Sequence, residues 1–144
     1  MHSAMADTTR KGRCLCGLIE FEAAGEPNWV AHCHCESCRR ATSAAFATYV
    51  GYPQAAVTWS GTGPARYRSS PGVMRSFCPR CGSPMSFEGE RWPDEIHLFV
   101  ASFEEPGQFQ PKAHVHVEEQ LPWIHLADSL KRFARTSREG PPIE

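Results

Sequence analysis

The sequence lacks three features that would place the protein in a large functional class. It has no basic excess, because 15 Lys and Arg face 16 Asp and Glu for a formal net charge of −1, so a nucleic-acid backbone is not an expected ligand. It has no apolar run near the ~20 residues of a membrane helix. Its opening, MHSAMADTTRKGR, lacks the apolar centre of a secretory signal. We therefore expect a cytoplasmic protein that binds neither nucleic acid nor membranes.

Internal repeats and linkers are also missing, and the 144 residues favour one domain, since domains most often contain about 100–150 residues. We expect a flexible lead-in over residues 1–11, a single domain over 12–135 and a frayed tail over 136–144.

Short, partly alternating apolar segments predict strands rather than helices. They cover residues 18–23, 44–50, 65–68, 95–102 and 113–119. The twelve prolines and eleven glycines indicate turns between these segments. Helical spacing occurs only over residues 126–134, so we expect a mainly β fold of short strands.

All seven cysteines lie in three short motifs, C-x-C, C-x-C-x-x-C and C-x-x-C. In order these are Cys14 and Cys16, then Cys33, Cys35 and Cys38, then Cys78 and Cys81. An odd number leaves one thiol over in a disulfide framework, and cytoplasmic thiols stay reduced. The spacing is typical of zinc ligands, which bind as thiolates in a tetrahedron.

The count of seven predicts one closed and one open zinc site. C-x-C at Cys14 and Cys16 and C-x-x-C at Cys78 and Cys81 each supply half of a structural four-cysteine site. The remaining Cys33, Cys35 and Cys38 cannot complete a tetrahedron, and catalytic zinc typically has three protein ligands and an exchangeable fourth position.

Three other interpretations of the cysteines remain open at this point. His32 or His34 could close the second site, which would then be structural too. Cys78 and Cys81 could form a redox pair, although no βαβ pattern surrounds them. Isolated cysteines are also common as buried apolar residues, but three tight clusters are not.

The motifs together resemble those of a known family. The segments CLCG, CHCESCRR and YRSSPGVMRSFCPRCGS, with the later ASFEEPGQFQPKAHVHVEEQLPW, are similar to the glutathione-dependent formaldehyde-activating enzyme family, which includes centromere protein V. The resemblance covers residues 12–134. It implies an Mss4-like (β-tent) fold of short antiparallel strands organised around two zinc ions, one structural and one catalytic, in a zinc-binding domain of the formaldehyde-activating type. It also implies the same division of the seven cysteines.

The function that follows is a zinc-dependent carbon–sulfur lyase or synthase. A small thiol, such as glutathione, would add to formaldehyde or a related aldehyde and give an S-hydroxymethyl adduct. Arg39 and Arg40 follow the last ligand and would offset thiolate charge or bind substrate carboxylates. His34 is a candidate proton carrier, and the resemblance favours His114 for the same role.

Other residues of the matching segments are expected to be structural. Ser69, Ser70 and Arg75 would serve turns and packing, and Trp123 would lie in the core, or else line the pocket. The alternative function is a non-catalytic zinc module that binds a protein partner, in which the second zinc would have four protein ligands.

Overall fold

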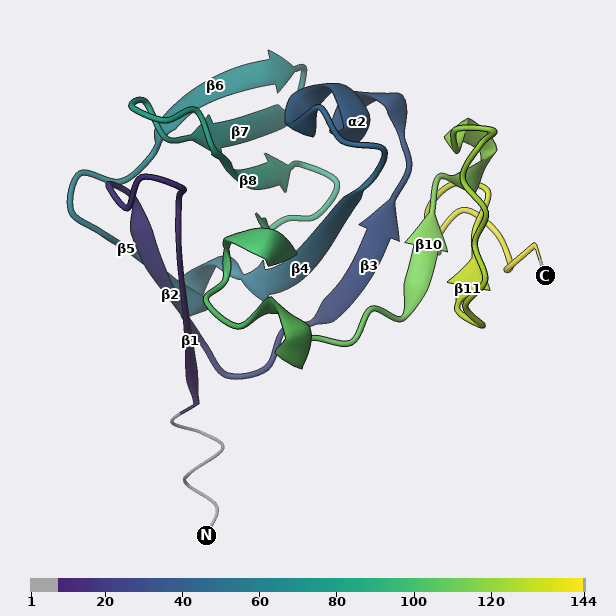
Figure 1. Ribbon diagram of the computed structural model, residues 1–144, viewed down its shortest axis with the longest axis horizontal. Coiled ribbons are helices and arrows are strands. Elements are labelled where there is room, and N and C mark those ends of the chain that lie inside the picture. The colour runs from purple at the N-terminus through teal and green to yellow at the C-terminus, as the bar shows by residue number, and fades with distance from the viewer. Residues whose placement is uncertain (1–7, 144) are drawn as a thin grey trace, which may run out of the picture. The chain divides into compact units, whose positions relative to one another are not determined.

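The structure, a computed structural model, describes residues 8–143, which are mainly β. The mainly β fold expected from the sequence is thus confirmed. In chain order the strands are β1 (Thr9–Arg13), β2 (Glu20–Ala24), β3 (Trp29–Cys33), β4 (Ala47–Pro53), β5 (Val57–Ser60), β6 (Ala65–Ser70), β7 (Val73–Phe77), β8 (Pro84–Gly89), β9 (Glu95–Phe99), β10 (Ala113–Val115) and β11 (Lys131–Arg132). The α-helix among these residues is α2 (Glu36–Thr42) (Figure 1).

Two compact units share the chain. One holds the residues up to Asn28 together with Val50–Phe109, and the other holds Trp29–Tyr49 and the residues from Gln110 onward. Strand β4 begins in the second unit and ends in the first.

A three-stranded antiparallel sheet, β1-β2-β5, forms part of the first unit. Phe21 in its central strand is buried and contacts Phe103 edge to face, with ring centroids 5.0 Å apart. Gly12 pairs with Phe21 across β1 and β2, and a Cβ on Gly12 would lie 2.2 Å from the Phe21 ring. The close approach of these strands therefore requires glycine at this position.

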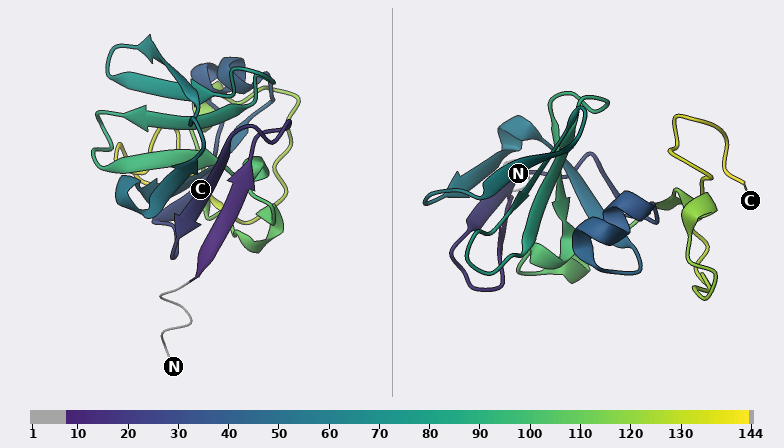
Figure 2. Two further views of the ribbon diagram at one scale, coloured as in Figure 1. Left: turned by 90° about the vertical axis from the view of Figure 1, so that its left-hand side faces the viewer. Right: turned by 90° about the horizontal axis from the view of Figure 1, so that it is seen from above.

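The first unit also contains an antiparallel meander, β6 to β9. These strands, teal to green in Figures 1 and 2, run side by side. The pairing of β7 with β8 shifts register between Ser76 and Phe77. Since β7 ends at Phe77, Cys78 is the first residue of the turn that follows.

The second unit brings the end of the chain back to β3. Strand β10 pairs in parallel with β3 and with β11, and its register sets His114 opposite His32 and Val115 opposite Cys33. Most other strand pairs are antiparallel, as expected. The two parallel strand pairs were not indicated by the sequence.

The helix predicted over residues 126–134 is wrong. The Asp128 carboxylate accepts a hydrogen bond from the Leu130 backbone N–H at 3.0 Å, a local turn that competes with helix formation. Lys131 and Arg132 then form β11, and the Phe133 N–H donates to the His114 carbonyl at 2.9 Å. Tertiary pairing has overridden a short helical pattern.

Helix α2 was not anticipated. Cys35 caps its N-terminus, because its Sγ accepts from the Cys38 N–H at 3.3 Å. Glu36 in the first turn and Arg40 in the last turn form an ion pair of 2.8 Å and suit the helix dipole. The capping residue and the two opposite charges were the signals for helix α2 in the sequence.

The chain ends differ in part from the expected lead-in and tail. Residues 9–11 belong to β1 rather than to a lead-in, and residues 1–7 and 144 lie outside the described part. In the tail, the Ile143 N–H donates to the Arg132 carbonyl at 2.8 Å. The single domain over 12–135 stays a prediction.

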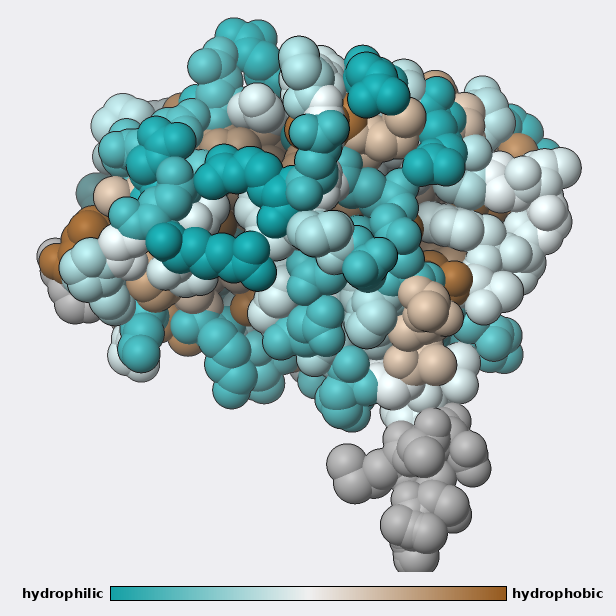
Figure 3. Space-filling view, turned by 180° about the vertical axis from the view of Figure 1, so that it is seen from behind, coloured by the Kyte–Doolittle hydropathy of each residue, from teal (hydrophilic) through white to brown (hydrophobic). Residues whose placement is uncertain are grey.

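No helix among residues 8–143 is long and apolar enough to cross a membrane. On the face drawn in Figure 3, hydrophilic residues dominate and apolar ones form small separate spots. The large apolar side chains that are exposed in the described residues are Leu15, Leu18, Tyr67, Trp123 and Ile143.

Candidate metal centres and active site

The four cysteines predicted to form the closed site converge in the first unit. The sulfurs of Cys14, Cys16, Cys78 and Cys81 all lie within 4.8 Å of one another, and none is in a disulfide. Cys16 is 3.6 Å from Cys14 and 3.8 Å from Cys78, measured between Sγ atoms. Four sulfurs about 2.3 Å from one zinc ion would be about 3.8 Å apart at tetrahedral angles. The donor set therefore fits zinc.

Tight turns at both halves of this cluster aim backbone N–H groups at sulfur. After β7, the N–H groups of Arg80 and Cys81 each donate to the Cys78 Sγ at 3.4 Å. Gly82 closes this turn with a φ of 80°, which favours glycine, and donates to the Cys78 carbonyl at 2.8 Å. After β1, the Ile19 N–H donates to the Cys14 Sγ at 3.3 Å. Backbone amides from both turns therefore point at the cluster sulfurs.

Neighbouring donors favour the thiolate form of two of these cysteines. The Ser83 hydroxyl lies 3.1 Å from the Cys81 Sγ, and hydrogen bonds from Ser83 lower the pKa of Cys81 to about 5. A backbone hydrogen bond from Leu18, and then one from the Arg80 guanidinium, lower the pKa of Cys16. Thiolates are the form that binds metal.

The three remaining cysteines converge in the second unit. Cys33 ends β3, Cys35 caps α2 and Cys38 lies within it, so their sulfurs meet within 4.8 Å. The Tyr49 hydroxyl donates to the Cys38 Sγ at 3.3 Å. Hydrogen bonding to the Cys35 and Cys38 sulfurs, and then burial, raise the pKa of Cys33. Crowded thiols of this kind need a cation to ionise together, which again fits a metal ion.

No histidine nitrogen or carboxylate oxygen of residues 8–143 joins the three sulfurs at that spacing. His32 is instead bound through Nδ1 to the Thr48 hydroxyl at 2.7 Å. His34 is bound through Nε2 to the Nδ1 of His114 at 3.0 Å. The interpretation in which His32 or His34 closes the second site is therefore not supported by the geometry, and the site has the donor set of an open one.

The two histidines predicted as proton carriers form a buried chain with a residue that the sequence analysis missed. His34 and His114 are 0% and 1% exposed. The Nε2 of His114 lies 3.0 Å from a carboxylate oxygen of Asp128, whose side chain is 42% exposed. Burial lowers the pKa of His34 to about 4. His116 shares no strand face with His114, because β10 ends at Val115.

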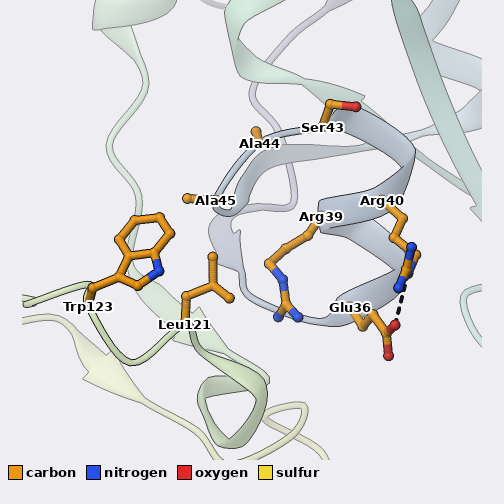
Figure 4. Close-up of a pocket in the computed structure, with 8 residues that line it drawn as sticks. All are labelled: Glu36, Arg39, Arg40, Ser43, Ala44, Ala45, Leu121 and Trp123. Atoms are coloured by element: carbon orange, nitrogen blue, oxygen red, sulfur yellow. Dashed lines mark hydrogen bonds and ion pairs between the residues drawn. The ribbon is translucent and has the colours of Figure 1, made fainter.

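A pocket of about 340 Å³ lies against α2 (Figure 4), near the small end of the range for ligand sites. It is lined by Glu36, Arg39, Arg40, Ser43, Ala44, Ala45, Leu121 and Trp123. Trp123 is 65% exposed, so the expectation of a core tryptophan is wrong and its place is on the pocket wall.

The two arginines of the pocket have different partners. Arg39 donates from Nη1 to the backbone carbonyls of His34 and Glu119, while Arg40 pairs with Glu36. Arg75, by contrast, is 6% exposed and donates to the Ser69 hydroxyl in the first unit, in line with a packing role. Leu121 and Trp123 belong to a segment without strand or helix periodicity, so no sequence signal marked them as pocket residues.

Comparison with known proteins agrees with this geometry. The sequence profile of the glutathione-dependent formaldehyde-activating enzyme family matches residues 9–119, more than half of the chain. The protein belongs to this family. The matched residues include all seven clustered cysteines and His114, while Trp123 and Asp128 lie beyond them.

Two relatives add to the family assignment. An uncharacterized lyase of Schizosaccharomyces pombe is 32% identical over 77 residues, 54% of this chain and 56% of the relative, so the chain spans about half the length of that curated relative. A Rhodobacter sphaeroides protein of known crystal structure is 24% identical, with a TM-score of 0.55 over 65% of this chain and 87% of its own. The second likeness shows the fold alone.

Proposed function

We propose that the protein is a zinc-dependent carbon–sulfur lyase or synthase that joins a small thiol to formaldehyde or a related aldehyde. The observation that carries the proposal is the three-sulfur cluster at Cys33, Cys35 and Cys38, which has no fourth side-chain ligand among the described residues. Its helix, α2, also lines a pocket of about 340 Å³. A scaffold zinc would be expected to have four protein ligands.

The family assignment and the relative named as a lyase support the same reaction class. A zinc ion held by the three cysteines would supply a place where a substrate thiol is kept as its thiolate. In the reaction, the substrate sulfur bonds to the aldehyde carbon, the carbonyl π electrons move to oxygen, and that oxygen takes the proton that the thiol lost. The reverse reaction breaks the carbon–sulfur bond.

The pocket indicates a thiol that carries a carboxylate, as glutathione does. Arg39 uses Nη1 for the backbone, and its Nε and Nη2 groups have no hydrogen bond to the described residues. Two such N–H groups form a planar fork that suits a carboxylate. Leu121 and Trp123 provide an apolar wall for the rest of the molecule (Figure 4).

The proton that the thiol loses needs a carrier near the cluster. His34 lies between Cys33 and Cys35 in the chain and is bonded to His114. We assign His34 to accept this proton at Nδ1 and His114 to hold the His34 ring in place.

The test combines zinc X-ray absorption with product detection. Adding glutathione should raise the mean number of sulfur ligands per zinc, and ¹³C-formaldehyde with glutathione should give the S-hydroxymethyl adduct faster than without protein. Arg39→Ala should raise KM for the thiol, whereas Arg66→Ala, which removes an exposed arginine paired with Glu88, should not. Unchanged sulfur coordination together with no acceleration would favour the non-catalytic zinc module.

A further inference from the structure

A chain of hydrogen bonds runs from the exposed Asp128 to the buried His34. Asp128 is 42% exposed on its side chain and accepts from His114 at 3.0 Å, and His114 is bonded to His34 at 3.0 Å. The second carboxylate oxygen of Asp128 accepts from the Leu130 N–H at 3.0 Å, so the carboxylate is held from both sides.

These hydrogen bonds determine which ring nitrogens of His114 and His34 carry protons. An ionised carboxylate only accepts hydrogen bonds, so the Nε2 of His114 must donate to Asp128. His114 is 1% exposed and stacks on the His32 ring, with ring centroids 4.7 Å apart. When each ring carries a single proton, the proton of His114 is the one at Nε2, so its Nδ1 accepts from the Nε2 of His34.

The hydrogen-bond chain ends at the Nδ1 of His34. With the ring protons placed in this way, that nitrogen carries no proton. That atom is buried and has no hydrogen-bond partner among the described residues. A buried polar atom without a partner is uncommon and costs stability, so an acceptor left free here is ready for a donor group of a bound molecule. His34 lies between Cys33 and Cys35, two of the clustered cysteines.

We propose that Asp128 is a positioning residue which, acting through His114, keeps the Nδ1 of His34 unprotonated as a hydrogen-bond acceptor for the thiol or hydroxyl of the substrate. The role of this acceptor rests on the proposed function, whereas the protonation order does not. Asp128 lies beyond residues 9–119, the part that matches the family profile, so the profile does not assign it. The hydrogen bond with His114 is also the largest cause that lowers the pKa of Asp128.

The first experiment reads the protons directly and needs no activity. Long-range ¹H–¹⁵N spectra of the zinc-loaded full chain, labelled with ¹⁵N-histidine, distinguish the two neutral ring forms. We expect Nε2–H at both His114 and His34. Asp128→Asn, whose amide can donate as well as accept, should shift both rings toward the other form, while Glu118→Gln, at an exposed carboxylate paired with Arg135, should shift neither.

The second experiment measures turnover of glutathione and formaldehyde. Asp128→Asn should lower kcat by about 10- to 100-fold, the loss typical of removing an outer partner of a site histidine, with little change in KM. Asp128→Glu should restore part of the rate because it restores a carboxylate. Glu118→Gln should keep the parent kcat.

Three results would overturn the proposal. The first is a proton on the Nδ1 of His34 in the parent protein, which can be seen even if the variant does not fold. The second is that the ring forms of His34 and His114 are unchanged in Asp128→Asn. The third is that the parent is active and Asp128→Asn has the same kcat. If the parent turns over no thiol while Asp128→Asn still shifts the rings, the proposed reaction fails and the positioning by Asp128 stands.

Discussion

The guanidinium of Arg80 donates from Nε to the sulfur of Cys16 at 3.2 Å and from Nη2 to the Cys16 carbonyl at 3.4 Å. Arg80 comes from the turn between Cys78 and Cys81, whereas Cys16 comes from the turn after β1. A positive charge bonded to a thiolate stabilises the charged form. The contact therefore connects the two halves of the four-cysteine cluster at its exposed sulfur.

Replacing Arg80 with alanine should make this cluster more labile. Without the guanidinium, the Cys16 thiolate loses a donor and a favourable charge, so we expect metal release to a chelator to become severalfold faster. Release can be followed with a colorimetric zinc indicator. Arg80→Lys keeps a charge but not the fork, and an intermediate rate is expected. Equal release rates in all three proteins would contradict the role of Arg80.

Metal analysis of the purified protein should find about two zinc ions per chain, since a four-sulfur and a three-sulfur cluster each fit one ion. Mass spectrometry under non-denaturing conditions checks both the count and the metal. A protein never exposed to chelator that carries no metal would refute both sites.

Cys81→Ser should abolish folded, soluble protein. Structural zinc contributes on the order of 10–16 kcal/mol in small peptides, against a net stability of about 5–15 kcal/mol for a typical domain. The cluster also joins residues 14–16 to residues 78–81, so its loss frees a long loop. Thermal unfolding followed by circular dichroism is the measurement, and a melting curve like that of the parent would show that this cluster is not structural.

Cys35→Ser should give the opposite pattern. The three sulfurs of its cluster come from six consecutive residues, 33–38, so they connect no distant segments. We expect a folded protein that keeps about one zinc ion and loses thiol-dependent turnover of formaldehyde. Unfolding as complete as that of Cys81→Ser would mean that both sites are structural.

Gly12→Ala tests the packing of the first unit independently of any metal. The new Cβ would lie 2.2 Å from the Phe21 ring and 2.7 Å from the Ser102 carbonyl oxygen, so we expect a loss of about 1–3 kcal/mol in the free energy of unfolding. Gly107→Ala is the matched control, because its Cβ would meet nothing within 4 Å. Urea unfolding of both variants measures the difference, and equal midpoints would contradict the close approach.

The sequence alone predicted five of the eleven described strands, β2, β4, β6, β9 and β10, and the division of the cysteines, because both depend on local patterns. C-x-C and C-x-x-C bring two sulfurs together within one turn, so Cys78 and Cys81 could be recognised as half of a site without knowledge of the fold. Alternation along β2 likewise reports burial on one face of the strand. The short alternating segments also predicted the mainly β fold, which the structure has.

Only the tertiary structure decided the surroundings of the three-cysteine cluster. Asp128 reaches His114, and His114 reaches His34, because β10 lies parallel to β3 and the chain after it turns back at Leu130. No spacing in the sequence encodes a contact between residues so far apart. The same is true of Trp123, which local composition placed in the core. Residues 126–134 show the general reason: a short segment has weak helical preference, and one side-chain turn and a strand partner are enough to override it.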